Sequence, residues 1–416
     1  MATEPTIPSH GALLDDAVLM TDVTPPELPN PQEGKTKEQL ETERKSVVFG
    51  RQDPTKPRGT SKKFDESNVA TCFCLDAIFG LLMGTSFKGS SQLNVNIHSE
   101  PQPLKRLPPV RQWNDLPAEQ KGKVRVAMTS CPKEAPGWEN QDSAMMCVPF
   151  SRAADDPPAE SMPEAPRLFF GVFDGHGRHG HEASRVAATR LPSHLSVSEH
   201  LSENPAKALR DAVLATDEDI YRNLGPVVEY SGTTGTIVMY DGVRKVLHMA
   251  NVGDSRAVLG RKVGNKWEAV ALTEDAKPDL PEELERIRLC GGVVEQAQEG
   301  GEPLGPYRVW ENAALVKPGL AVSRTLGDGC ARGCGVIADP MVSEHKLRPE
   351  DRFVLIGSDG IWDSLGNQQA VQIASMFLEE TKVPIAPKAL TNKVKQIEEA
   401  FVDDTTIIIV VLPPME

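Results

Sequence analysis

The stretch LFFGVFDGHGRHGHEAS, residues 168–184, holds the residue types best suited to chemistry. Its three glycines follow an apolar run in the spacing G-x-G-x-x-G, which is the outline of a dinucleotide-binding turn. Asp174 stands directly before the first glycine and His176 follows it. A loop that cradles a pyrophosphate explains neither residue. The stretch is therefore either a cofactor loop or a metal site with an acid beside it.

The cofactor interpretation needs a second feature downstream. A dinucleotide-binding turn is followed, about twenty residues on, by an acidic residue that binds the ribose hydroxyls. The corresponding segment here offers only Glu199, within a weak Ser-rich run. A glycine pattern without that partner is a weak signal, so the sequence argues against a nucleotide cofactor.

The metal interpretation gains support from other aspartates that begin or end strand-like runs. A single Asp-Gly is most often only a turn. So many acidic ends could converge on one edge of a sheet sandwich, where they would repel one another unless cations neutralised them. These residues are Asp142, Asp174, Asp254, Asp359, Asp363, Asp403 and Asp404.

An oxygen-only ligand set suits Mg²⁺ or Mn²⁺ rather than zinc or copper. Two such ions can deprotonate a water for in-line attack on a phosphoryl group. The leaving alkoxide must then be protonated, and an imidazole such as that of His176 can do so near neutral pH. A solvent-exposed loop histidine without a chemical role is the alternative at this point.

Composition limits the partners and the compartment. The formal net charge of −14 argues against a nucleic-acid surface, which needs clustered Lys and Arg. Seven cysteines without a leader peptide suggest a reducing compartment, so we expect the protein in the cytoplasm and also in the nucleus. We also expect a monomer. The cysteine pairs CFC and CARGC lack the spacing of a zinc site.

Residues 1–120 form the first predicted region. They are rich in Pro, Glu, Thr and Lys, so we expect a largely disordered N-terminal extension. Its apolar segment at 72–84 is shorter than the roughly 20 residues of a membrane span. A short docking helix is one interpretation; membrane contact through acylated Cys72 or Cys74 is the other.

Residues 121–416 have the sequence pattern of a folded domain. Short β-type runs cluster early and late, and helical patterns come in groups between them. The clearest helix is predicted over 204–224, with Asn204 as its N-cap and Pro205 at its first position. This arrangement favours an α+β fold over a doubly wound parallel sheet. Residues 150–166 read as a mobile surface insertion.

The motifs taken together resemble the type 2C family of metal-dependent serine/threonine protein phosphatases, in its plant and protist branch. They run in order over about 290 residues and include ENQDS, FDGHGRHG, SGTTGT, ANVGDSRAVLG, AVSRTLGDG, SDGIWD and DDTTIIIVV. The resemblance implies a central sandwich of two antiparallel β-sheets with α-helices on both outer faces. It also implies a catalytic domain over 121–416 with a flap subdomain at about 296–340.

The resemblance further implies roles for individual residues. Asp174 would bridge two Mg²⁺ or Mn²⁺ ions, and the backbone carbonyl of Gly175 would ligate the second. Asp359 and Asp403 would hold the first ion, and Asp142 would support the site through water.

His176 falls where the family places its general acid. Asp254 and Asp363 match positions associated with a weaker third ion. The implied reaction is hydrolysis of phosphoserine and phosphothreonine in protein substrates by a metal-bridged hydroxide.

Three residues depart from the family pattern. Gly137 stands where the animal members place a phosphate-clamping arginine, and Lys133 is the nearest base. Ala276 replaces a usual histidine, for which we expect a local packing effect. Asp404 replaces a common asparagine, and its extra charge could tighten metal binding or face solvent.

Two other classes of function compete with an active phosphatase. One is a catalytically weak, phosphatase-like scaffold or binding module, because a fold does not by itself establish an activity. The other is a metal-dependent nuclease, which the acidic charge and the lack of a basic aromatic groove disfavour. The retained carboxylates and His176 favour the active phosphatase.

Overall fold

The computed structural model describes residues 124–147, 167–378 and 382–415. The predicted N-terminal extension, the apolar segment at 72–84 with Cys72 and Cys74, and the predicted insertion at 150–166 lie outside these residues. No helix in the described part of the chain is long and apolar enough to cross a membrane.

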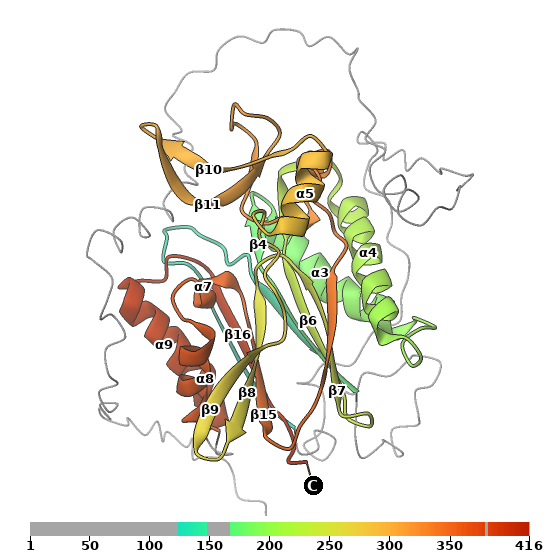
Figure 1. Cartoon of the computed structure of the whole chain (residues 1–416), viewed down its shortest axis with the longest axis vertical. Helices are drawn as coiled ribbons and strands as arrows, with labels where there is room; N and C mark the ends of the chain where they lie inside the picture. Colours follow the sequence, from blue (N-terminus) through green and yellow to red (C-terminus); the bar gives the residue numbers. More distant parts are fainter. Residues whose placement is uncertain (1–123, 148–166, 379–381, 416) are drawn as a thin grey trace, which may run out of the picture.

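Two five-stranded antiparallel sheets form the centre of the molecule (Figure 1). The first sheet has the strand order β14-β7-β6-β3-β2, with bounds Met341–Lys346, Val246–Val252, Gly235–Asp241, Arg167–Phe173 and Ser143–Cys147. The second has the order β1-β16-β15-β8-β9, with bounds Arg125–Cys131, Thr405–Val411, Asp351–Gly357, Arg256–Val263 and Lys266–Ala271.

Successive side chains of a strand point to opposite faces of the sheet, and this alternation explains how the layers assemble. In β3, Leu168, Phe170 and Val172 point into the core between the two sheets. Phe169 and Phe173 point to the opposite face, into the core beneath the helices. Neither face of β3 reaches solvent, which is why the strand reads as a continuous apolar run.

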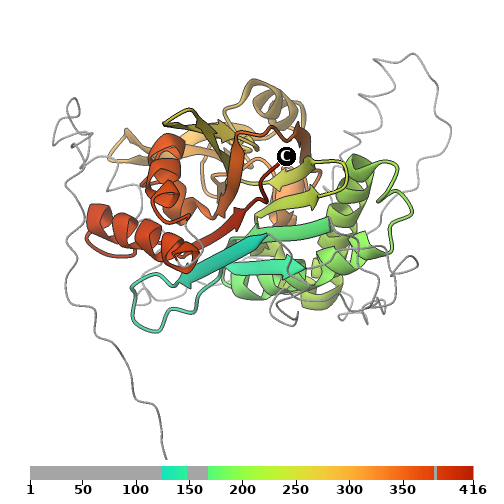
Figure 2. The ribbon, with the colours of Figure 1, turned by 90° about the horizontal axis from the view of Figure 1, so that it is seen from below.

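Helices cover both outer faces of the sandwich (Figure 2). Helices α3 (Gly180–Ser196) and α4 (Pro205–Leu224) cover the first sheet, and α8 (Asn367–Ser375) and α9 (Ala386–Glu398) cover the second. The predicted α+β fold with a helix-covered antiparallel sandwich is confirmed.

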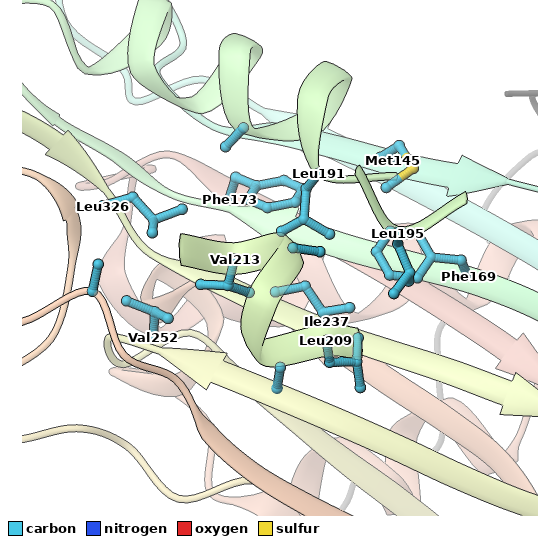
Figure 3. Close-up of a cluster of buried hydrophobic side chains, with 14 of the residues drawn as sticks. Met145, Phe169, Phe173, Leu191, Leu195, Leu209, Val213, Ile237, Val252 and Leu326 are labelled. Carbon is cyan, nitrogen blue, oxygen red and sulfur yellow. The ribbon is translucent and has the colours of Figure 1, made fainter. Parts of the chain in front are cut away.

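The predicted start of α4 is confirmed in detail. The side chain of Asn204 accepts a hydrogen bond from the backbone N–H of Lys207, and Pro205 is the first helical residue. Leu209 and Val213 face the first sheet, where they lie beside Ile237 (Figure 3). The cap therefore determines where this helix begins, and its apolar stripe determines which face packs on the sheet.

The remaining elements lie at the end of the sandwich where the predicted site residues gather. A three-stranded flap sheet stands above that end, and a second small sheet joins β4, β5 and β13 (Figure 1). The flap strands are β10 (Val293–Glu299), β11 (Glu302–Trp310) and β12 (Pro318–Leu320). The other elements are β4 (Gly175–Gly177), η4 (Gly225–Tyr230), β5 (Ser231–Thr233), α5 (Pro281–Leu289), β13 (Leu326–Gly327), α6 (Gly329–Arg332), α7 (Asp359–Trp362) and η5 (Val383–Ile385).

Glu283 ties α5 to the chain that leaves the flap. It is 1% exposed, and its carboxylate accepts hydrogen bonds from Arg286 and Arg324 at 2.7 Å each. Burial alone would raise the pKa of Glu283, but these bonds and one from Ser323 lower it to about 2. The ionised carboxylate is therefore part of the folded structure.

Glu283→Gln is expected to lower the free energy of unfolding at neutral pH by about 3 kcal/mol, because two arginines lose their partner. The folded-state pKa lies below the unfolded value, so this contribution is full above about pH 4.5 and is lost as the pH falls toward 2. Urea unfolding at several pH values measures it. The exposed neighbour Glu282→Gln is the control and should change stability by less than about 0.5 kcal/mol. An equal gap between Glu283→Gln and wild type at every pH would contradict this account.

Candidate active site

Strand register brings the predicted carboxylates to one end of the sandwich. Phe173 pairs with Ser143, so Asp174 and Asp142 leave the first sheet side by side. Gly357 pairs with Ile407 in the second sheet, which carries Asp359 and Asp403 to the same end. The two sheets meet here, because the Ser358 hydroxyl donates a hydrogen bond to Asp142 at 2.8 Å.

Close packing explains two of the opening glycines. The N–H of Gly175 donates to the carbonyl of Gln141 at 3.2 Å. A Cβ on Gly175 would lie 2.3 Å from the Gly180 carbonyl oxygen and 2.5 Å from that of Gln141. The glycines thus let two backbone segments approach beside Asp174, and a phosphate-binding turn is not needed to explain them.

The buried carboxyl groups repel one another. Burial and the charges of Asp359, Asp142 and Asp403 raise the pKa of Asp174 well above its ordinary value. Burial and the charges of Asp254, Asp403 and Asp363 do the same for Asp359. The carboxyl groups of Asp174 and Asp359 also hydrogen-bond to each other. Buried carboxyl groups that repel one another in this way need protons or cations to neutralise their charge.

The outer members of the cluster behave in the same way. Burial is the main cause that raises the pKa of Asp142 to about 7 and that of Asp363 to about 6. Burial also raises the pKa of Asp403. Asp254 forms an ion pair with Lys277, which balances one charge of the group. The charges of Asp142, Asp174, Asp254, Asp359, Asp363 and Asp403 therefore act on one another.

The donor set fits divalent cations of the Mg²⁺ type. Oδ1 of Asp142 is buried and has no hydrogen-bond partner within the described ranges, although Oδ2 is bonded to Ser358. Within the described part of the chain, no group of three or more His, Cys, Asp or Glu side chains is arranged so that it could hold a metal ion by itself. Ions held here would therefore take other ligands from water and from carbonyls such as that of Gly175. Mg²⁺ characteristically keeps several waters in this manner.

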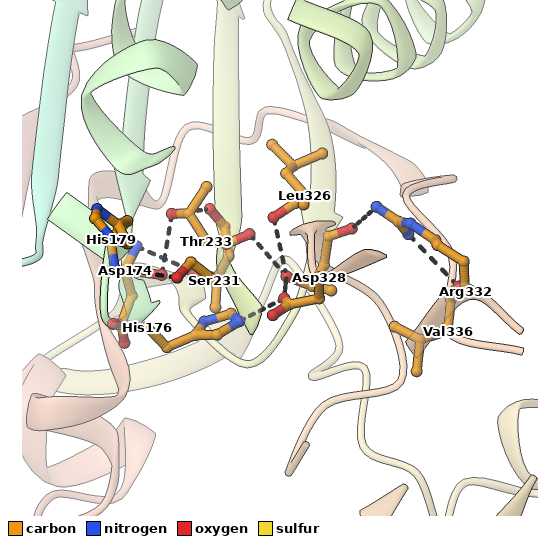
Figure 4. Close-up of polar contacts among 12 residues, drawn as sticks. Asp174, His176, His179, Ser231, Thr233, Leu326, Asp328, Arg332 and Val336 are labelled. Carbon is orange, nitrogen blue, oxygen red and sulfur yellow. Dashed lines mark hydrogen bonds and ion pairs between the residues drawn. The ribbon is translucent and has the colours of Figure 1, made fainter. Parts of the chain in front are cut away.

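His176 lies beside the carboxylates on β4 and has a partner that sequence reasoning missed. Its Nε2 lies 2.6 Å from Oδ2 of Asp328, a residue that is 2% exposed (Figure 4). Burial lowers the pKa of His176, but the Asp328 carboxylate outweighs burial and raises it overall. The His176 side chain is thus 29% exposed and paired, rather than freely exposed to water as in the alternative interpretation.

The sequence contained a signal for Asp328, but a weak one. The residue lies in the quoted motif AVSRTLGDG, and 152 positions separate it from His176. Its backbone is left-handed, with φ of 50°, a conformation that Asp tolerates better than most residues. A polar residue next to glycine reads as an ordinary turn.

Asp404 organises the loop before β2. Its carboxylate accepts hydrogen bonds from the backbone N–H groups of Lys133 and Gln141, at 2.8 Å each, and from the indole N–H of Trp138 at 2.9 Å. Asp404 is only 3% exposed. Of the two alternatives for Asp404, the one in which it faces solvent is therefore wrong, because these donors hold the carboxylate inside.

The loop conformation accounts for the missing arginine. Gly137 has a φ of 71°, in the left-handed region that glycine adopts more readily than any residue with a Cβ, arginine included. Lys133 instead stands with its Nζ 4.6 Å from the centroid of the Trp138 ring. Its charge also lowers the pKa of Asp403, so it lies within electrostatic reach of the cluster.

Ala276 is fully buried between the Asp254 turn and the chain beyond the flap. Its N–H donates to the Gly253 carbonyl and its carbonyl accepts from the Ser323 N–H, both at 2.8 Å. The structure thus agrees with the expected packing effect of this departure.

Comparison with known proteins decides the family. The family model for protein phosphatase 2C matches residues 146–401, which is more than half of the chain. The chain belongs to the protein phosphatase 2C family. It is 42% identical over 223 residues to probable protein phosphatase 2C 64 of Oryza sativa, covering 51% of this chain and 50% of that one. It is 36% identical over 262 residues to probable protein phosphatase 2C 72 of Arabidopsis thaliana, covering 59% and 77%.

Solved structures agree with the phosphatase 2C fold. A serine-threonine phosphatase 2C from Toxoplasma gondii superposes with a TM-score of 0.59 at 21% identity, covering 74% of this chain and 99% of that one. A C. elegans sex determining protein superposes with a TM-score of 0.55 at 23% identity, covering 70% and 66%. The family is that of the protein phosphatases 2C, and the chain spans half the length of the Oryza sativa relative.

Proposed function

We propose that this phosphatase 2C hydrolyses phosphoserine and phosphothreonine in proteins with bound Mg²⁺ or Mn²⁺. The observation that carries the proposal is the buried group of mutually repelling aspartates, in which Asp142 Oδ1 has no hydrogen-bond partner among the described residues. A site of this kind is costly to fold unless cations neutralise it. It lies beside an imidazole that can deliver a proton.

The aspartates would divide the work of holding two ions. Asp174 would contact both, the Gly175 carbonyl would contact the second, and Asp359 and Asp403 would hold the first. Asp142 would support the site through water. When bound, the ions supply an activated water and neutralise phosphate charge. Asp254 and Asp363, whose charges both raise the pKa of Asp359, would hold a third ion.

His176 would protonate the leaving oxygen of serine or threonine. The alkoxide of an aliphatic alcohol is strongly basic, so its departure needs a proton in the transition state. The polypeptide places the imidazole on β4, two residues after Asp174 and directly after the carbonyl of Gly175. The same short segment therefore supplies a carboxylate, a carbonyl and an acid to one place.

Phosphate release from matched peptides tests this function. The full chain with Mn²⁺ is expected to dephosphorylate phosphothreonine and phosphoserine peptides, and to release little phosphate from ATP or from a terminally phosphorylated oligonucleotide. The scaffold alternative predicts no release from any of the four substrates. Preference for the oligonucleotide would favour the nuclease class instead.

A further inference from the structure

We infer that Asp328 is a positioning residue that fixes the ring of His176, and that a brace from helix α4 fixes Asp328 in turn. The inference rests on the proposed function and adds to it the residues that orient the acid. Oδ2 of Asp328 accepts from Nε2 of His176 at 2.6 Å (Figure 4). The same oxygen accepts from the Thr325 hydroxyl at 2.8 Å. One buried oxygen thus joins the histidine to the chain that leaves the flap.

The bond to Asp328 assigns the two ring nitrogens. An ionised carboxylate only accepts, so the bond to Asp328 puts a proton on Nε2. Nδ1 is then the nitrogen that exchanges a proton with the substrate. A carboxylate that selects one tautomer and one ring orientation is the general way in which an imidazole is prepared for proton transfer.

The brace acts on Thr325 and Gly327, shortly before Asp328 in the chain. The carboxylate of Asp217 on α4 accepts from the backbone N–H of Gly327 and from the guanidinium of Arg332, at 2.8 Å each. Arg332 also donates to the Thr325 carbonyl at 3.0 Å, and the hydroxyl of Tyr221 donates to the Gly327 carbonyl at 3.1 Å. Helix α4 thereby holds β13 from several sides, and the left-handed turn of Asp328 follows directly.

Kinetics with a double-mutant cycle test the inference. Asp328→Asn keeps the shape and suits the left-handed backbone, but it removes the charge that selects the tautomer. It is expected to lower kcat for a phosphothreonine peptide by about 10- to 100-fold and to change kcat for p-nitrophenyl phosphate by less than about 3-fold. Added to His176→Ala, it should have almost no further effect, because both changes remove the same function.

Two further variants define the specificity of the effect. Asp217→Asn should give a smaller loss with the same preference for the peptide substrate. Asp339→Asn is the matched control: Asp339 follows the same segment and pairs with Arg210 of α4 at 2.9 Å, but makes no contact with Asp328. It should leave both rates unchanged. Equal losses of Asp328→Asn on both substrates, a further loss in the His176→Ala background, or no loss at all would overturn the inference.

A spectroscopic measurement separates this inference from the proposed function. Nitrogen-15 shifts of the His176 ring in the Mg²⁺-loaded protein, at a pH where the ring is neutral, should show a proton on Nε2. Asp328→Ala should yield mixed tautomers. If the wild type released no phosphate, the proposed function would fail while this signature could still be read. An unchanged tautomer in Asp328→Ala would overturn the inference whatever the activity.

Discussion

Replacing Asp359 with asparagine is expected to lower kcat for a phosphothreonine peptide by about 10²- to 10³-fold, while making the metal-free protein more stable. The activity falls because the variant lacks a charged ligand at the centre of the carboxylate cluster. The stability rises because Asp359 is buried among like charges, with Asp254, Asp403 and Asp363 all opposing its ionisation. Removing one charge from such a group relieves repulsion by about 1 to 3 kcal/mol.

Thermal unfolding in EDTA and in Mn²⁺ measures the stability part of this prediction. Wild type should be stabilised by Mn²⁺, because ligands that bind only the folded state raise its stability, and Asp359→Asn should lose most of that response. Asp351→Asn is the matched control from the other end of strand β15. Asp351 is paired with Arg261 and His345, which outweigh burial and lower its pKa, so its loss should destabilise the protein and leave the Mn²⁺ response intact. A metal-free Asp359→Asn protein less stable than wild type would contradict the electrostatic account.

His176→Ala is expected to show the second large effect. Turnover of a phosphothreonine peptide should fall by about 10²- to 10³-fold, because the basic alkoxide leaves without a proton. Turnover of p-nitrophenyl phosphate should fall by less than about 10-fold, because nitrophenolate leaves readily without protonation. The ratio of the two losses is the informative quantity.

A neighbouring histidine provides the control for that ratio. His179 lies three residues further along and pairs with Glu182 at 2.9 Å, away from Asp328. His179→Ala should lower the turnover of both substrates by the same factor or leave both unchanged. Equal losses on both substrates in His176→Ala would contradict the general-acid role, even if the losses were large.

Most of the fold and the central carboxylates were predictable because their signals are local. The apolar runs before Asp174 and Asp359 are buried strands, and residues at the ends of paired strands meet at a sheet edge. The cap of α4 is a property of two adjacent residues, Asn204 and Pro205. The assignment of particular aspartates to particular ions remains a prediction.

The contacts of Asp328 and Asp404 were not predicted, because their partners lie far away in the sequence. Asp328 meets His176 across 152 positions, and Asp404 meets Lys133 across 271. Asp404 was considered only for its charge, yet its main contacts are with a loop whose backbone it holds. Nothing local to either aspartate specifies those partners, because long-range pairing is set by the packing of the whole sandwich.

Phosphate release from a phosphothreonine peptide during a Mn²⁺ titration of the EDTA-treated full chain tests the central claim most directly. The claim is that the buried aspartates act by holding divalent cations. It predicts no release in EDTA, a rate that rises and saturates with Mn²⁺, and no comparable rise in Asp359→Asn. Release that persists in EDTA, or a saturating Mn²⁺ response of normal size in Asp359→Asn, would contradict it.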